Sequence, residues 1–453
     1  MRNPWAICYS YSRRTLAQSL FSPSLPTRII PFLHSSRHTR QHASTAMSSA
    51  KWKSSPRVFR TSGFELLDPC VKFEEETLPT YFPEKYYPVR QGEIFNERYQ
   101  ALAKVGYGVT STVWLARDLC ESTYVILKVY VPGQGREHEL NVYTHIDSIE
   151  TDHPGKKFVR QLFDHFYIDR TGSRHLCLVH QPLGINTSEF LRLRNGRRVT
   201  LESMKSVIRQ LLGALDFLHS VVGLIHTDIQ LNNLLLPAPS PAALSAFEEQ
   251  ELQRPAPRKI LGDRTIYTTS HLPAGDGLPL LSDLGEARFG DEDHFESIMP
   301  DYYRAPEVIL KSNWDYKVDI WSVGMVAWDL VSPNTIIEGK VIDGIFDDGA
   351  HIAELVALLG PPSPEFLEKM DMSWVFWDES GNWKNLVSIP DRTFEKSAVN
   401  IQDEDVEGFL GWLRRALQWN PADRPTALEL LMDPWLMKGL KLRKKPVDKP
   451  HDE

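Results

Sequence analysis

The pattern of hydrophobic residues changes once along this chain, near residue 184, and this change constrains the fold more than any other feature. Residues 99–105, 112–117, 124–129 and 176–179 have the composition of short β-strands, and one charged helical segment lies near 137–149. Beyond residue 186 hydrophobic residues recur at helical spacing, as in Leu201, Met204, Ile208, Leu211 and Leu215. We therefore expect an α+β protein: a small, mostly antiparallel sheet with one helix, followed by a larger, mainly α domain.

Charge is unevenly distributed. The first 64 residues contain ten Lys or Arg and no Asp or Glu, which leaves 41 basic and 59 acidic residues in the rest of the chain. An acid-free basic stretch resembles an organellar transit peptide, and a disordered basic tail is the alternative. The acidic remainder argues against non-specific nucleic-acid binding.

The remaining composition narrows the class of protein further. No run approaches the roughly 18 apolar residues of a membrane-spanning helix, and the four cysteines form neither a disulfide framework nor a zinc motif. We expect no contact with membranes or nucleic acid, a reducing compartment and a monomer.

A glycine-rich motif connects the first two expected strands, in Val105-Gly-Tyr-Gly-Val-Thr-Ser-Thr-Val113. Glycines there let the backbone fold closely over phosphates and offer N–H groups to them. Lys128 follows in an apolar strand, where it can neutralise phosphates if a carboxylate orients it. Glu139 is the better candidate for that carboxylate and Glu137 the alternative, because Leu140 and Tyr143 place an apolar helix face near Glu139.

Two polar motifs in the second half carry the chemistry. His226-Thr-Asp-Ile-Gln-Leu-Asn-Asn233 has an Asp five residues before an Asn, and Asp283-Leu-Gly285 follows a Pro/Ala-rich insert at 237–280. Phosphoryl transfer needs one carboxylate for the acceptor hydroxyl, plus an amide oxygen and a second carboxylate for Mg²⁺. We interpret the insert itself as a surface excursion without catalytic content.

Together with these motifs, Ala305-Pro-Glu307, Asp319-Ile-Trp-Ser-Val-Gly324 and Arg424 resemble the eukaryotic protein kinase family over about residues 97–437. Within it the chain is most similar to SR-protein kinases of a fungal type. The residues that carry this closer resemblance are Tyr87-Pro-Val-Arg, the stretch from Gly92 to Tyr99, Ser111-Thr-Val-Trp-Leu115, Thr227 and Asp283-Leu-Gly285.

The resemblance implies a bilobal protein-kinase fold that uses ATP and Mg²⁺. Asp228 would orient and deprotonate the substrate hydroxyl, Asn233 and Asp283 would hold Mg²⁺, and Lys128, paired with Glu139, would hold phosphates. The implied nucleotide-binding residues are Val105, Gly106, Gly108, Ser111, Val113 and Lys128, with the Gln181 carbonyl and the Leu183 N–H facing adenine behind His180. Glu307 would pair with Arg424.

The expected organisation follows from these boundaries. Residues 1–64 form a basic disordered region or transit peptide, 65–98 an irregular lead-in, 99–183 the N-lobe, 184–439 the C-lobe with the insert, and 440–453 a charged tail. The resemblance implies Ser/Thr phosphorylation of Ser/Arg-rich or basic protein substrates, in the cytoplasm and nucleus. The basic N-terminus favours a mitochondrion instead, and the acids Asp343, Asp347, Asp348 and Glu354 are candidates for a groove that attracts basic substrates.

Three positions depart from the family pattern. Gln230 replaces a lysine beside the catalytic Asp, Pro300 replaces a threonine that bonds it, and Ile126 replaces a small alanine against adenine. Loss of the lysine charge costs on the order of 2–4 kcal/mol of transition-state stabilisation. We therefore expect an active, slow kinase, with a pseudokinase scaffold as the alternative.

Thr227 stands where many kinases have an arginine that pairs with a phosphorylated activation loop. The loop 283–307 contains no Thr, has Ser297 as its only Ser, and already includes acids such as Glu296. This combination predicts activity that does not wait for phosphorylation of the loop.

Overall fold

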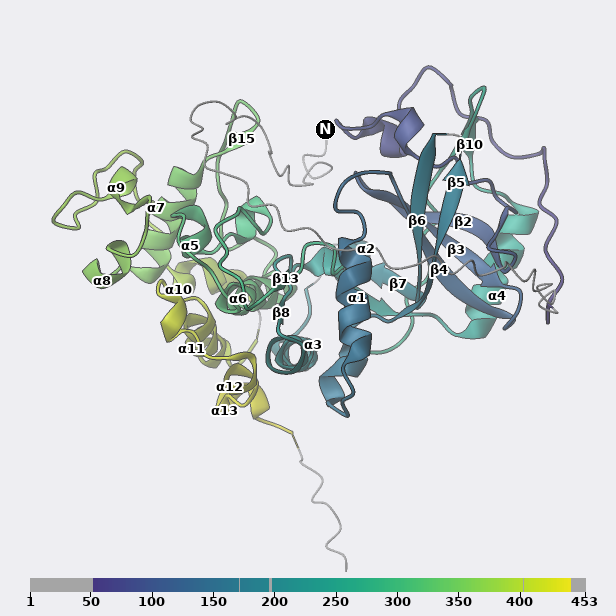
Figure 1. The fold of residues 1–453 in the computed structure, drawn as a ribbon. Coiled ribbons are helices and arrows are strands. Elements are labelled where there is room, and N and C mark those ends of the chain that lie inside the picture. The colour runs from purple at the N-terminus through teal and green to yellow at the C-terminus, as the bar shows by residue number, and fades with distance from the viewer. Residues whose placement is uncertain (1–51, 171, 195–197, 402, 441–453) are drawn as a thin grey trace, which may run out of the picture.

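A computed structural model describes residues 52–170, 172–194, 198–401 and 403–440. It has two lobes, a sheet with one long helix beside it and a larger assembly of helices (Figure 1). This is the α+β, bilobal arrangement expected from the change in hydrophobic pattern. Among the described residues no helix is both long and apolar enough to cross a membrane.

The N-lobe is built on a six-stranded antiparallel sheet in the order β1-β2-β3-β4-β6-β5. Its strands and helix are β1 (Ile94–Phe95), β2 (Tyr99–Tyr107), β3 (Ser111–Asp118), β4 (Thr123–Tyr130), β5 (Leu162–Arg170), β6 (Ser173–His180) and α1 (His138–Ser148). Alternate residues of a strand point to opposite faces. Trp114 and Leu127 therefore belong to a hydrophobic cluster on one face, whereas Leu115 and Ile126 belong to another on the opposite face.

The C-lobe consists mainly of helices with short strands between them. Its helices are α2 (Thr187–Leu193), α3 (Leu201–Asp216), α5 (Pro306–Ile309), α6 (Lys317–Val331), α7 (Asp348–Leu359), α8 (Pro364–Leu367), α9 (Ser373–Phe376), α10 (Phe394–Ser397), α11 (Val406–Ala416), α12 (Ala427–Leu431) and α13 (Pro434–Met437). Its strands are β7 (Leu183–Asn186), β8 (Leu224–Ile225), β9 (Leu234–Pro237), β12 (Leu280–Leu281), β13 (Arg288–Phe289), β14 (Val341–Ile342) and β15 (Ile345–Phe346).

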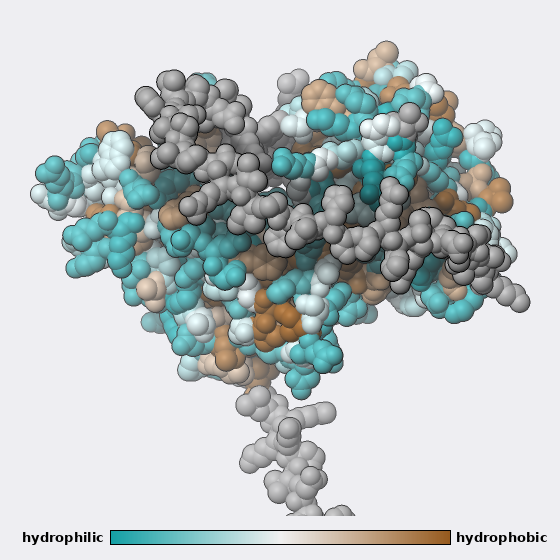
Figure 2. Space-filling model, in the orientation of Figure 1, coloured by the Kyte–Doolittle hydropathy of each residue, from teal (hydrophilic) through white to brown (hydrophobic). Residues whose placement is uncertain are grey.

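Helices α3 and α6 form the centre of the C-lobe core. The side chain of Thr200 caps α3 by accepting a hydrogen bond from the Ser203 N–H, and the predicted apolar stripe is buried. Helix α6 is apolar on nearly every side, so that Trp321 and Trp328 are fully buried. The surface seen in Figure 2 is mostly hydrophilic, with hydrophobic side chains in separate patches.

The insert is not the surface excursion that its composition indicated. It forms α4 (Pro241–Gln253), β10 (Arg258–Ile260) and β11 (Thr265–Tyr267), and α4 lies against the N-lobe sheet (Figure 1). Glu248 of α4 is fully buried and bonds Arg57, Arg117 and the Tyr124 hydroxyl. Sequence reasoning missed this packing because the partners of Glu248 lie more than 120 residues away in the chain.

The lead-in also packs on the N-lobe, and it begins earlier than expected. The Trp52 indole donates to the Glu97 carbonyl at 2.8 Å, and the Lys53 N–H donates to the Leu119 carbonyl at 2.9 Å. The expectation of disorder up to residue 64 therefore fails for 52–64, while residues 1–51 and the tail from 441 lie outside the described residues. Two 3₁₀ turns, Glu74–Thr77 and Pro83–Lys85, lie in the rest of the lead-in.

Candidate active site

The loop after β8 carries the expected catalytic residues and is fastened to α6. The buried Asp319 carboxylate accepts the N–H groups of His226 and Thr227 at 2.8 and 2.9 Å. Thr227 has a φ of 67°, in the left-handed region that a non-glycine residue adopts only when its surroundings impose it. These bonds fix the backbone immediately before Asp228.

The Asp228 carboxylate is held by two neutral amides. Gln230 Nε2 donates to one of its oxygens and Asn233 Nδ2 to the other, both at 2.8 Å. Burial, helped by the nearby Asp283 charge, raises the pKa of Asp228 to about 7. Gln230 therefore still bonds the Asp228 carboxylate although it brings no charge, whereas Pro300 offers no hydroxyl at its turn.

Lys128 lies between two carboxylates from different lobes. Its ammonium is 2.8 Å from Glu139 of α1 and 3.0 Å from Asp283. Burial alone would lower the pKa of Lys128, but these two carboxylates outweigh it and hold that pKa well above its usual value. The alternative acid, Glu137, instead accepts the Tyr167 hydroxyl.

The glycine-rich motif forms the turn between β2 and β3. Gly106 pairs with Val113, and the Gly108 N–H donates to the Ser111 carbonyl at 2.8 Å. Val113 in turn pairs with Lys128 of β4, so both side chains lie on the same face of the sheet. Val105, Gly106, Gly108, Ser111 and Val113 thus lie at the end of the sheet that carries Lys128.

The hinge between the two lobes, residues 181–183, is contacted by Arg160, which sequence reasoning missed. Its Nε donates to the Gln181 carbonyl at 3.1 Å, which uses one of the two acceptor positions of that oxygen. Leu183 pairs with Pro237 of β9. Burial lowers the pKa of His180 well below its usual value, so this side chain is neutral. No motif around Arg160 could have signalled its role.

The insert borders the same hinge. A Cβ on Gly184 would lie 3.0 Å from the Pro273 carbonyl oxygen and 3.2 Å from Ala274 Cα, so a larger residue there would require the insert backbone to move by a few tenths of an ångström. Ile126 is buried in one hydrophobic cluster with Leu272 of the insert. The side chain of Ile126 therefore packs in a hydrophobic cluster to which the insert contributes. The family pattern, which has an alanine at this position, gave no indication of this packing.

The end of the activation loop is held by a buried ion pair. Arg424 donates to both carboxylate oxygens of Glu307, at 2.6 and 2.7 Å. Within the loop, Arg288 Nε lies 2.9 Å from Glu296, and the Thr227 hydroxyl donates to the Glu286 carbonyl at 2.7 Å. Glu296 thus presents to Arg288 the negative charge that a phosphate on this loop would supply.

The side chains expected to hold Mg²⁺ lie near the Asp228 carboxylate. Asn233 bonds Asp228 through its NH₂ group, which leaves its amide oxygen as a ligand, and Asp283 adds a carboxylate. Hard oxygen donors in small number suit Mg²⁺, which takes further ligands from phosphates and water. Among the described residues, no group of three or more His, Cys, Asp or Glu is arranged to hold a metal ion.

Comparison with known proteins agrees with this geometry. The protein kinase domain family matches residues 99–436. A serine/threonine protein kinase of Aspergillus fumigatus is 39% identical over 389 residues, covering 85% of this chain and 96% of the relative. The serine/threonine-protein kinase SRPK of Physarum polycephalum is 26% identical, covering 80% and 91%, and SRSF protein kinase 3 of Sus scrofa is 22% identical, covering 80% and 90%.

The fold and site therefore define an enzyme that transfers phosphate to proteins. The chain belongs to the protein kinase family. Within that family it is an SRPK-like serine/threonine protein kinase, as the residues of the lead-in and the catalytic loop indicated.

Proposed function

We propose that this kinase uses ATP and Mg²⁺ to phosphorylate serine in Ser/Arg-rich or other basic proteins. The observation that carries the proposal is the convergence of Lys128, Glu139 and Asp283 with the Asp228–Asn233 pair. Bound Mg-ATP supplies the phosphoryl group and the metal charge that stabilises it.

The residues of the chain divide the remaining tasks. Asp228 orients the substrate hydroxyl and accepts its proton, and its raised pKa makes its carboxylate a better base than an ordinary Asp. Gln230 and Asn233 hold that carboxylate in one orientation. Lys128, kept charged by Glu139, binds phosphate oxygens. Asn233 and Asp283 are the residues that would hold the metal.

The proposal of a basic substrate is supported by the names of the relatives and by the net negative charge of the chain. It does not rest on the acidic groove that the sequence suggested. Two of the relatives are named as SRPK and SRSF kinases, and the chain beyond residue 64 is strongly acidic. Of the four acids expected to form a groove, Glu354 is buried against Arg392, Asp347 caps α7, and Asp348 lies 3.4 Å from Arg304. Those three carboxylates have partners within the protein.

Phosphate transfer to a Ser/Arg-repeat peptide tests the function, with a Ser/Glu-repeat peptide as the charge control. Asp228→Asn removes the base and should lower kcat by about 10²- to 10⁴-fold, while Mg-ATP should still raise the melting temperature of the variant. Equal transfer by both proteins would assign the signal to a contaminating kinase. No transfer and no Mg-ATP thermal shift in the native chain would favour the scaffold.

For the location we propose the cytoplasm and nucleus, following the family resemblance, with the mitochondrion as the alternative from the acid-free N-terminus. N-terminal sequencing of the protein isolated from its cells distinguishes the two. A mature N-terminus close to residue 50 would favour import and cleavage.

A further inference from the structure

A tyrosine of the lead-in bonds the glycine-rich loop directly. The Tyr86 hydroxyl donates to the Gly108 carbonyl at 3.0 Å, and Tyr86 is 4% exposed. Burial raises the pKa of Tyr86 to about 12, so the hydroxyl remains protonated and able to donate. Tyr86 lies outside the 99–436 region that matches the kinase domain family.

Tyr86 approaches the glycine-rich loop from the face of the sheet that carries Trp114. It borders a cavity of about 20 Å³ together with Thr112 and Trp114 of β3. Val113, between those two residues, points to the opposite face, which it shares with Lys128. The Gly108 carbonyl is therefore held on the side of the sheet away from Lys128.

The direction of this carbonyl fixes the direction of the next N–H group. In a planar trans peptide the C=O and the following N–H point to opposite sides. With the Gly108 carbonyl held toward Tyr86, the Val109 N–H points toward the face that carries Lys128. Backbone N–H groups on that face are the donors that a phosphate-binding glycine loop uses.

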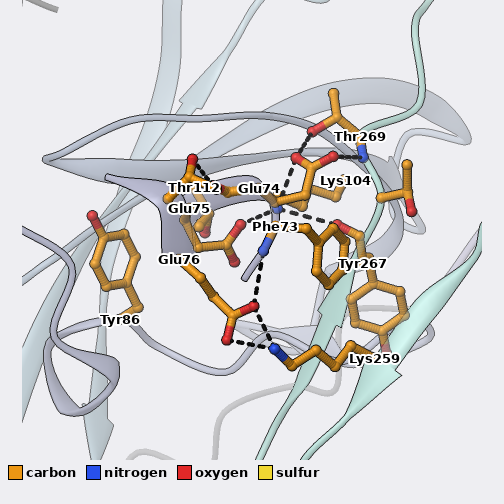
Figure 3. Close-up of polar contacts among 12 residues, drawn as sticks. Phe73, Glu74, Glu75, Glu76, Tyr86, Lys104, Thr112, Lys259, Tyr267 and Thr269 are labelled. Carbon is orange, nitrogen blue, oxygen red and sulfur yellow. Dashed lines mark hydrogen bonds and ion pairs between the residues drawn. The ribbon is translucent and has the colours of Figure 1, made fainter. Parts of the chain in front are cut away.

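A polar cluster beside Tyr86 fastens the lead-in to β2 (Figure 3). The ammonium of Lys104 bonds Glu75 and the Tyr267 carbonyl, and it lies 4.7 Å from the centre of the Tyr107 ring in the glycine-rich motif. Lys104 and Glu75 are both buried. The ring of Tyr86 packs 5.0 Å from that of Tyr81.

The same turn of the lead-in also bonds the insert. Glu74 accepts the Thr269 hydroxyl at 2.6 Å, and Glu76 lies 2.7 Å from Lys259 of β10 (Figure 3). Consecutive glutamates thus connect β2 on one side and the insert on the other. The support of Tyr86 does not depend on the nucleotide.

We propose that Tyr86 is a positioning residue that orients the glycine-rich loop for phosphate binding through its bond to the Gly108 carbonyl. This proposal rests on the proposed use of ATP. Without the bond, the loop spends part of its time with the Val109 N–H turned away, and the apparent affinity for the nucleotide falls by that fraction.

Tyr86→Phe removes only the hydroxyl, and Tyr87→Phe is the matched control because the neighbouring Tyr87 hydroxyl bonds Glu93 rather than the loop. Loss of one hydrogen bond predicts a threefold to tenfold rise in KM for ATP in Tyr86→Phe, with kcat within about twofold. Tyr87→Phe should leave both constants unchanged.

Hydrogen–deuterium exchange of residues 106–112 without nucleotide separates this proposal from the proposed function. Faster exchange of these residues in Tyr86→Phe, but not in Tyr87→Phe, supports the positioning role of the Tyr86 hydroxyl. The proposal for Tyr86 is overturned if exchange and the KM for ATP are the same in the native chain and in Tyr86→Phe. It is also overturned if Tyr86→Phe lowers kcat and leaves KM unchanged. If the native chain binds no Mg-ATP, the proposed function fails and the phosphate role of Tyr86 fails with it, whatever the exchange result.

Discussion

At the scale of single residues, position 230 keeps a hydrogen bond to Asp228 but has lost a positive charge. Gln230 donates to Asp228 where a lysine would both donate and stabilise the transferring phosphoryl group. Gln230→Lys should therefore raise kcat by roughly tenfold or more. Steady-state kinetics on a Ser/Arg peptide measures this, with Asn400→Lys as the control for a charge added at an exposed position elsewhere in the C-lobe. An equal gain in both variants would contradict the role of position 230.

Asp329 of α6 gives a pH-dependent prediction. Burial raises its pKa from 3.8 to about 6, although the Tyr303 hydroxyl donates to it at 2.6 Å. Between these values the unfolded carboxyl ionises while the folded one stays protonated, so stability falls as pH rises from about 4 to 6 and stays lower above that. The upper limit of this loss is about 3 kcal/mol.

Asp329→Asn keeps an acceptor for Tyr303 and removes the titration. Its melting temperature relative to the native chain should rise between pH 4.5 and pH 7.5. A difference that does not vary with pH would show that Asp329 is not protonated in the folded state near pH 5.

At the scale of elements, two contacts of the activation loop predict activity that does not require phosphorylation of that loop. Glu296 supplies the negative charge to Arg288, and Thr227 bonds a loop carbonyl where an arginine would bind phosphate. Phosphatase treatment should leave activity unchanged, whereas Glu296→Gln should lower kcat/KM about threefold to tenfold. The exposed Glu292, changed to Gln, is the control. Loss of activity after phosphatase would refute this explanation.

At the scale of the whole molecule, the lead-in and insert form a second layer on the N-lobe. Glu248→Ala would leave Arg57 and Arg117 without their shared carboxylate. Because Glu248 is fully buried but both arginines are partly exposed, we expect a loss of about 2–3 kcal/mol, near the lower end for a broken buried ion pair. Thermal unfolding measures it, with the exposed Glu249→Ala on the same helix as control. Equal melting temperatures would show that α4 does not stabilise the lobe.

The sequence by itself determined the fold class and the family, because the signals for both are local. Strand alternation, helical spacing and the motifs around Asp228 and Asp283 each lie within a few neighbouring residues. The preference for Glu139 over Glu137 came from the apolar face of one helix, and the structure pairs Glu139 with Lys128.

Only the tertiary structure decided what holds these motifs in place. Tyr86 on Gly108, Arg160 on the Gln181 carbonyl, and Glu248 among its arginines join residues 21 to 191 positions apart. A buried charge or a single hydrogen bond leaves no periodic trace in the chain, since its partner can come from any segment that folds beside it. The lead-in and insert thus read as irregular in sequence, and their packing around the N-lobe appears only once the chain is folded.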